Sequence, residues 1–147
     1  MTTAIHLCTP DDADQLLALI ARCHAETGLN RDDAHRRAAT LPLLNGATQG
    51  AAYLFGPRRA PTGYVIVSFG WSIAAGGMDA MLDELFVRPG VRRRGIAAEV
   101  LIAIAGALRD GGIKALHVAS SSDPGMQALY IRAGFTPDST VLMTRRF

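Results

Sequence analysis

Apolar residues recur every three or four positions in the first third of the chain, a period that places them along one face of a helix. They are Ala13, Leu16, Leu17, Ile20 and Cys23. Thr9, Pro10 and Asp12 precede them in the pattern of a helix start: a hydroxyl cap, a proline in the first turn, and an acid three residues after the cap. Gly28 supplies a stop signal. The pattern predicts a helix that ends at Gly28, preceded by a strand over residues 4–8.

A second helix is predicted from Asp32 to about Leu44. Beyond Gly50 the helical period gives way to short β-branched and aromatic runs, separated by turns that contain glycine and proline. Runs and turns of this kind predict a meander of antiparallel strands. The predicted strands cover residues 51–55, 63–69 and 80–87.

The alanine- and leucine-rich stretch 95–112 predicts a long helix, and its few charges predict that most of its surface is buried. Residues 113–121 predict a strand. Strand 80–87, the long helix and this strand make a β-α-β unit, so the two strands should be parallel and joined by a right-handed crossover. Residues 125–135 predict a short helix, and residues 140–147 predict a closing strand.

Composition narrows the class of protein. The chain is 49% hydrophobic and 19% charged, which argues against disorder, and 147 residues are typical of one domain, here 1–147. A net charge of +2 is too small to indicate a nucleic-acid partner. The N-terminus lacks the signal-peptide pattern, no apolar run reaches membrane length, and Cys8 and Cys23 lack metal-ligand spacing. We expect a cytosolic protein with no metal site.

Positive charge is concentrated in one loop between a predicted strand and the long helix. Its residues are Arg88, Arg92, Arg93 and Arg94, all within seven positions. A helix N-terminus carries free N–H groups and the positive end of the helix dipole, and Gly95 lets a ligand approach the backbone. The loop therefore predicts a site for a dianion such as pyrophosphate, with a merely solvated surface as the alternative. It contains neither a P-loop nor the three spaced glycines of a Rossmann loop.

Two motifs around this unit resemble those of a known family. The segment RRRGIA (92–97) resembles the Arg/Gln-x-x-Gly-x-Gly/Ala signature of the GNAT superfamily of N-acetyltransferases. The segment DPGMQALYIRAGF (123–135) resembles that family's Asn-x-x-Ala-x-x-x-Tyr-x-x-x-Gly-Phe segment, with Asp123 and Met126 where asparagine and alanine are usual. The resemblance covers essentially the whole chain. It implies an α/β fold whose central mixed sheet has about six or seven strands flanked by about four helices.

The resemblance also implies an activity. Members of this family move an acetyl group from acetyl-CoA directly to a primary amine, without an acyl-enzyme, and neither cysteine stands in a nucleophile motif. Tyr130 matches the family tyrosine that protonates the departing thiolate. Asp83 and Glu84 are alternatives for the base that takes the proton of the amine. Because neighbours on a strand point to opposite faces, only one of the two should face the site.

Coenzyme and acceptor contacts follow from the same resemblance. The backbone of strand 80–87 would pair with the pantetheine arm, and the arginine loop would hold the pyrophosphate. The residues implied in coenzyme binding are Leu85, Phe86, Val87, Arg92, Arg93, Arg94, Gly95, Ile96, Ala97, Asp123 and Met126. The acceptor groove would be lined by the first two helices and a strand-connecting loop. These elements carry His24, Glu26, Arg31, Asp32, Trp71 and Ser72, and the acceptor amine, of a small molecule or a protein, stays open.

Two other functions fit part of the pattern. The same fold could bind acetyl-CoA as a sensor without catalysis, or residues 88–94 could serve a small basic nucleic-acid-binding module. The second alternative leaves Tyr130 and the long apolar helix unexplained, and the loop lacks the aromatic residues of single-strand binders. We expect a small-molecule amine as partner, with no nucleic acid and no membrane, and leave a homodimer open.

Overall fold

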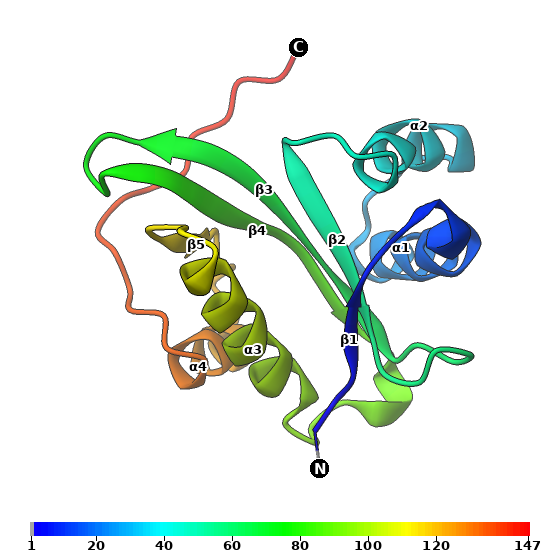
Figure 1. Cartoon of the computed structure of the whole chain (residues 1–147). Coiled ribbons are helices and arrows are strands. Elements are labelled where there is room, and N and C mark those ends of the chain that lie inside the picture. Colours follow the sequence, from blue (N-terminus) through cyan, green and yellow to red (C-terminus); the bar gives the residue numbers. More distant parts are fainter. Residues whose placement is uncertain (1) are drawn as a thin grey trace.

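The computed structural model describes residues 2–147, which form one five-stranded sheet and four α-helices (Figure 1). The strands are β1 (Ile5–Leu7), β2 (Gly50–Phe55), β3 (Gly63–Ser72), β4 (Gly77–Val87) and β5 (Leu116–Val118). The helices are α1 (Ala13–Thr27), α2 (Asp33–Leu44), α3 (Ile96–Asp110) and α4 (Pro124–Arg132), with 3-10 turns at Pro10–Asp12 and Pro89–Val91. The strands follow one another in chain order. β1 to β4 are antiparallel and β5 is parallel to β4, so the predicted meander and the parallel strand pair are confirmed.

The sheet separates two layers of helices, with α1 and α2 on one face and α3 and α4 on the other (Figure 1). The alternation of side chains along β3 explains this arrangement. Tyr64 and Ile66 belong to the core under α1, and Val65 and Val67 to the core under α3. All four are buried, so β3 reads as a continuous apolar run although its pairing is antiparallel.

Local signals set the ends of the first two helices. The Asp12 carboxylate accepts a hydrogen bond of 2.8 Å from the Thr9 N–H ahead of α1, and Gly28 closes that helix with a φ of +74°. The Asp32 carboxylate accepts a hydrogen bond of 2.8 Å from the His35 N–H and caps α2. Such caps satisfy backbone groups that the helix itself leaves free. Both helices therefore lie where the sequence predicts them.

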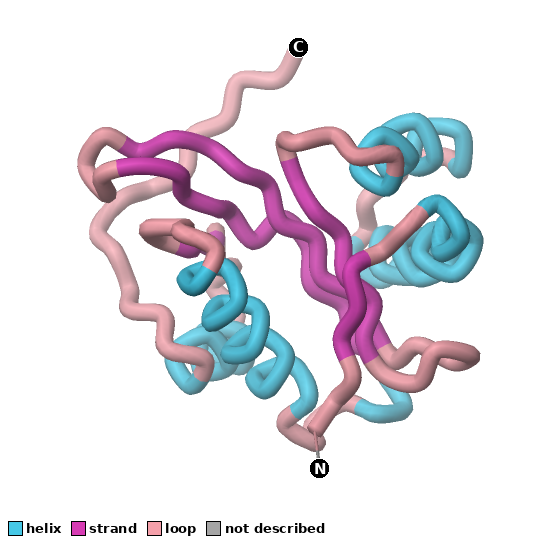
Figure 2. The backbone as a smooth tube through the Cα atoms, in the orientation of Figure 1, coloured by secondary structure: helices cyan, strands magenta, loops and turns pink. Residues whose placement is uncertain are grey.

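The sheet has fewer strands than predicted. Residues 140–147 predict a closing strand and the resemblance implies six or seven strands, but residues 2–147 contain five, and none follows α4. The segment 136–147 runs irregularly to the C-terminus (Figure 2), and its Val141, Leu142 and Met143 are 81, 70 and 89% exposed. A strand needs the edge of a neighbour, and the three-residue β5 offers only a short edge.

Helix α3 is buried on one side only, so the prediction that most of its surface is buried is wrong. Val100, Leu101 and Ile104 face the sheet, whereas Ile102 is 53% exposed. The exposed side is filled by small residues such as Ala103 and Ala107, which cost little when they face water. No helix in the described part of the chain combines the length and the apolar character needed to cross a membrane.

Candidate functional site

A β-bulge in β4 shapes the candidate site. Glu84 pairs with Ile66 on β3 and Leu82 pairs with Val67, which leaves Asp83 as the extra residue. The bulge changes which face each side chain takes: Leu82 packs in the core under α3, whereas Phe86 packs in the core under α1. Glu84 consequently lies on the α1 side of the sheet.

A cavity of about 300 Å³ lies on that side, between α1, α2, β3 and β4. Asp83 and Glu84 both line it, so the expectation that only one of them faces the site is wrong; the bulge breaks the alternation on which that expectation rests. The other polar residues that line the cavity are His24, Arg31, His35, Arg36 and Thr40. The apolar residues of its lining are Ile20, Leu29, Ala39, Leu43 and Ile66.

Both carboxylate oxygens of Glu84 are held by buried side chains. The Tyr64 hydroxyl donates to Oε1 at 2.7 Å, and Nε2 of His24 lies 2.9 Å from Oε2. Burial, followed by the neighbouring Cys23 and Glu84, raises the pKa of Tyr64, so this phenol remains a donor. Nδ1 of His24 is buried and has no hydrogen-bond partner in residues 2–147. Glu84 is therefore a carboxyl group whose position is set by α1 and β3.

Asp83 differs from Glu84 in having no hydrogen-bond partner within the described residues. Asp83 is exposed as a residue, but partial burial of its carboxyl group raises its pKa, the charge of Glu84 raises it further, and His24 opposes the change. A carboxylate with a raised pKa is a stronger base than an ordinary aspartate. Asp83, which has no partner in that part of the chain, is thus suited to accept a proton from a molecule in the cavity, whereas both oxygens of Glu84 are engaged.

The edge of β4 is open beside this cavity. β5 pairs with β4 only from Ala80 to Leu82, so no described strand covers the edge of β4 from Asp83 to Val87. Leu85, Phe86 and Val87 lie on this open stretch, where an extended ligand can add to the sheet as a short strand would.

The arginine loop follows directly, and its first arginine is already engaged. The Arg92 guanidinium lies 2.7 and 2.8 Å from the two carboxylate oxygens of Glu26, donates to the Val87 carbonyl at 2.8 Å, and stands 5.5 Å from the ring centre of Phe86. Arg92 therefore ties α1 to the end of β4. Arg93 and Arg94 are exposed and form no ion pair within residues 2–147.

The backbone of the loop leaves room for a ligand at the start of α3. Arg93 and Gly95 have φ values of +64° and +78°, both in the left-handed region. No side chain of residues 2–147 caps helix α3. The backbone N–H groups of its first turn, beginning with Ile96 and Ala97, therefore have no side-chain acceptor among these residues. A β-carbon built on Gly95 meets no atom of the protein within 4 Å. This combination of free N–H groups, open space and exposed arginines suits a phosphate.

Tyr130 lies on α4, 9% exposed, in the core that includes Leu82 and Val87 of β4. Its ring packs edge-on against Phe135 at 5.6 Å between ring centres, and burial raises its pKa. Asp123 accepts a hydrogen bond of 2.9 Å from the Met126 N–H and caps α4, so the residue at the usual asparagine position orients this helix.

Comparison with known proteins settles the family. The model of the acetyltransferase (GNAT) family matches residues 15–135. The chain belongs to this family. No curated protein sequence matches the chain.

Solved structures share the fold over nearly the full length of the chain. A candidate acetyltransferase from Arthrobacter sp. FB24 is 28% identical, with 98% of this chain and 94% of that chain covered and a TM-score of 0.78. An integron cassette protein from the mobile metagenome of Cole Harbour Salt Marsh is 25% identical, with 97% and 89% covered and a TM-score of 0.86. AAC(6')-Iy in complex with the bisubstrate analogue CoA-S-monomethyl-acetylneamine is 16% identical, with 100% and 99% covered and a TM-score of 0.83.

Not every residue implied by the GNAT resemblance lies at the cavity. Trp71 and Ser72 lie at the tip of the β3–β4 hairpin, where Trp71 is 71% exposed and the Ser72 hydroxyl accepts a hydrogen bond from the Ala75 N–H. Trp71 lies five positions along β3 from Ile66, which lines the cavity. Five positions of an extended strand span about 16 Å. The structure therefore does not bring these two residues together with His24.

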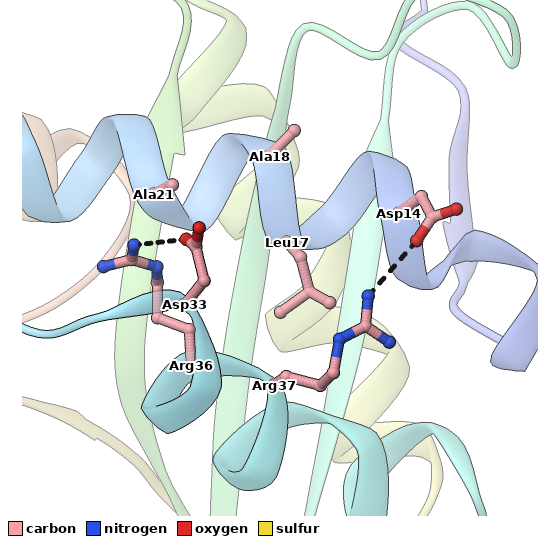
Figure 3. Close-up of a pocket in the computed structure, with 7 residues that line it drawn as sticks. All are labelled: Asp14, Leu17, Ala18, Ala21, Asp33, Arg36 and Arg37. Carbon is pink, nitrogen blue, oxygen red and sulfur yellow. Dashed lines mark hydrogen bonds and ion pairs between the residues drawn. The ribbon is translucent and has the colours of Figure 1, made fainter.

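A second hollow, of about 240 Å³, lies between α1 and α2 of this GNAT chain (Figure 3). Its charged groups pair with one another across or along the helices: Arg37 with Asp14 at 3.5 Å, and Arg36 with Asp33 at 2.5 Å. Paired charges leave no free group for a ligand, so this hollow is a contact between two helices. No three histidine, cysteine or acidic side chains in residues 2–147 are grouped as a metal would require.

Tyr64, His35 and Arg36 line or support the cavity, although sequence reasoning did not select them. Tyr64 reads as one more aromatic residue of a buried strand, and His35 has no partner at an informative spacing. Only the register of β3 against β4, which pairs Tyr64 with Phe86, places its hydroxyl beside Glu84. Only a prediction of that register could have indicated that Tyr64 supports the cavity.

Proposed function

We propose that this protein is an acetyl-CoA-dependent N-acetyltransferase that transfers the acetyl group directly to a primary amine of a small molecule, in the cytosol. The observation that carries the proposal is the junction of three features: the open edge of β4, the cavity with Asp83 and Glu84 beside it, and the loop with free N–H groups at α3. The bisubstrate analogue bound to AAC(6')-Iy, which joins CoA to an amine compound, supports the same chemistry on this fold.

Each group has a defined task in the proposed reaction. When bound, acetyl-CoA supplies an activated acetyl thioester. Asp83 takes a proton from the acceptor ammonium in the cavity, and Glu84, held by Tyr64 and His24, fixes the amine by its charge. A carbon–nitrogen bond forms as the carbon–sulfur bond breaks, and the nitrogen releases its remaining excess proton to water. Tyr130 gives its phenolic proton to the departing thiolate and regains one from water, and backbone N–H groups on the open edge of β4 face the oxyanion.

Calorimetry with acetyl-CoA, followed by a panel of amines with detection of the free thiol, tests the proposal. Binding together with thiol release supports the enzyme. Binding without release for any amine favours a catalytically silent sensor, and the absence of binding contradicts both.

Arg94→Ala should weaken acetyl-CoA binding about 10- to 100-fold, the effect of one charge-assisted contact. Arg59→Ala is the matched control, since Arg59 is equally exposed and lies in the β2–β3 turn.

Homodimer formation is a further proposal. Val141, Leu142 and Met143 are three consecutive apolar residues with exposed side chains, and β5 is an edge strand. A second copy can cover both features by adding its C-terminal segment to β5. Analytical ultracentrifugation should show a dimer that dissociates in the Leu142→Ser variant; a monomeric wild-type protein contradicts the proposal.

A further inference from the structure

The polar lining of the cavity comes from two parts of the chain. Asp83 and Glu84 on β4 form its acidic end. Arg31, in the α1–α2 loop, forms its basic end, and His35, in the first turn of α2, also lines the cavity. His24 stands on the acidic side, bonded to Glu84.

The basic end has one cation, Arg31, that no carboxylate in residues 2–147 neutralises. Arg36 is not such a cation, because its guanidinium pairs with Asp33 and also donates to the Arg31 carbonyl. The only hydrogen bond of the Arg31 guanidinium in residues 2–147 goes to the Asn30 carbonyl, at 3.2 Å, and the His35 ring has no partner in that part of the chain.

The nearby acids do not change this balance. Asp32 caps α2 through the His35 N–H, Asp33 is used by Arg36, and neither lines the cavity. The basic end therefore presents unpaired positive charge to any molecule in the cavity. The other walls of the cavity are apolar, and include Ile20, Leu43 and Ile66.

We infer that the acceptor is an amino-acid-like molecule, with an amine for the two carboxylates of β4, a carboxylate for Arg31 and an apolar side chain against the apolar walls; this inference rests on the proposed acetyl transfer. The amine lies at Asp83 and Glu84, where deprotonation is needed. The carboxylate pairs with Arg31, whose planar guanidinium suits two-pronged contact with such a group. A polyamine or another polycation would place a second positive charge against Arg31, and like charges discriminate against such a partner.

Matched acceptors test the inference. L-leucine, L-leucinamide and isoamylamine share a side chain, and only leucine carries a carboxylate; spermidine serves as the polycation. Wild-type protein with acetyl-CoA should acetylate leucine with a kcat/KM at least about tenfold above the amide and the amine, the effect of one charge-assisted contact. Preference for spermidine or for the two amines without a carboxylate would overturn the inference and leave the acetyltransferase proposal standing.

Two arginine variants test whether Arg31 is the residue that selects acceptors with a carboxylate. Arg31→Gln should raise the KM for leucine about tenfold or more and leave isoamylamine unchanged. Arg59→Gln removes the same charge from an exposed turn and should change neither. An equal loss for both acceptors in Arg31→Gln would mean that Arg31 supports the structure and does not select the carboxylate.

Binding of leucine, measured by calorimetry in the presence of CoA without an acetyl group, separates the two proposals. Leucine bound in preference to leucinamide, with the preference lost in Arg31→Gln, supports the inferred site even if no acetyl group is transferred. Equal or absent binding of the two ligands contradicts it, whatever the turnover with other amines.

Discussion

His24 on α1 and Glu84 on β4 are joined across 60 residues of sequence by a contact of 2.9 Å between Nε2 and Oε2. The bond fixes the Glu84 carboxylate from the helix side while Tyr64 fixes it from the sheet. A carboxyl group whose two oxygens are each held by a neighbouring side chain stays in place. It leaves Asp83, the neighbour displaced by the bulge, as the carboxyl group free to exchange a proton.

Glu84→Gln tests this division of roles. The amide oxygen can still accept from Tyr64, but the amide NH2 faces His24, and Nε2 can accept from it only when the ring proton is on the buried Nδ1, which has no partner in the described part of the chain. We expect the free energy of unfolding to fall by about 1–3 kcal/mol, the cost of a buried polar group without its partner. The KM for the amine should rise and the affinity for acetyl-CoA should not change. Denaturant unfolding, calorimetry and steady-state kinetics measure the three effects.

Asp79→Asn is the matched control. Asp79 accepts from His117 at 3.0 Å on the same strand, outside the cavity and with the histidine exposed. An exposed pair contributes at most about 1 kcal/mol, so this variant should be close to wild type in stability and in KM. Equal effects of the two substitutions would show that Glu84 has no special role.

Asp83→Asn should raise stability and lower activity at neutral pH. The pKa of Asp83 is higher in the folded protein than its ordinary value of 3.8, because burial and Glu84 disfavour the charged form. The folded state therefore binds this proton more tightly than the unfolded state, and the carboxyl destabilises the fold as pH rises through that interval. The stability gain of Asp83→Asn should be present at pH 7 and disappear below about pH 3.8.

Activity supplies the second readout for Asp83. If Asp83 is the base, the kcat/KM of the wild-type enzyme rises as the pH passes through the raised pKa of Asp83. This rising part of the pH profile should be absent in Asp83→Asn. A wild-type pH profile in Asp83→Asn, together with loss of the rising part in Glu84→Gln, would assign the base to Glu84 instead.

Sequence reasoning located the elements and the motifs but not the assembly of the cavity. Helix caps act within a few residues, so Thr9, Gly28 and Asp32 predict the ends of α1 and α2. The bulge at Asp83 depends on how β3 and β4 pair, which no local pattern encodes. For the same reason, neither the contact between His24 and Glu84 nor the absence of a strand in 140–147 could be predicted: both depend on which distant segments meet.

Gly95 offers a test of the coenzyme loop. Its φ of +78° strains any L-residue, which costs about 1–2 kcal/mol, but a β-carbon there meets no protein atom. Gly95→Val should therefore lower the free energy of unfolding only modestly, while acetyl-CoA binding falls below detection because the side chain fills the approach to α3. Gly112→Val is the control, with a φ of +94°, equally open space and a position after α3. Normal acetyl-CoA affinity in Gly95→Val would reject the loop as the phosphate site.

Tyr130→Phe tests the proton donor. Burial raises the pKa of Tyr130 above its ordinary value of 10.0, so the phenol is protonated throughout the physiological range and can protonate a thiolate as the carbon–sulfur bond breaks. The substitution keeps the ring and its edge-on contact with Phe135. We expect normal acetyl-CoA affinity and a kcat reduced about 100- to 1,000-fold, the range for loss of a positioned general acid. Tyr53→Phe removes a hydroxyl from another partly buried tyrosine whose pKa is also raised by burial, and should leave kcat unchanged. If both variants turn over at the wild-type rate, Tyr130 is a packing residue of α4 and another group protonates the thiolate.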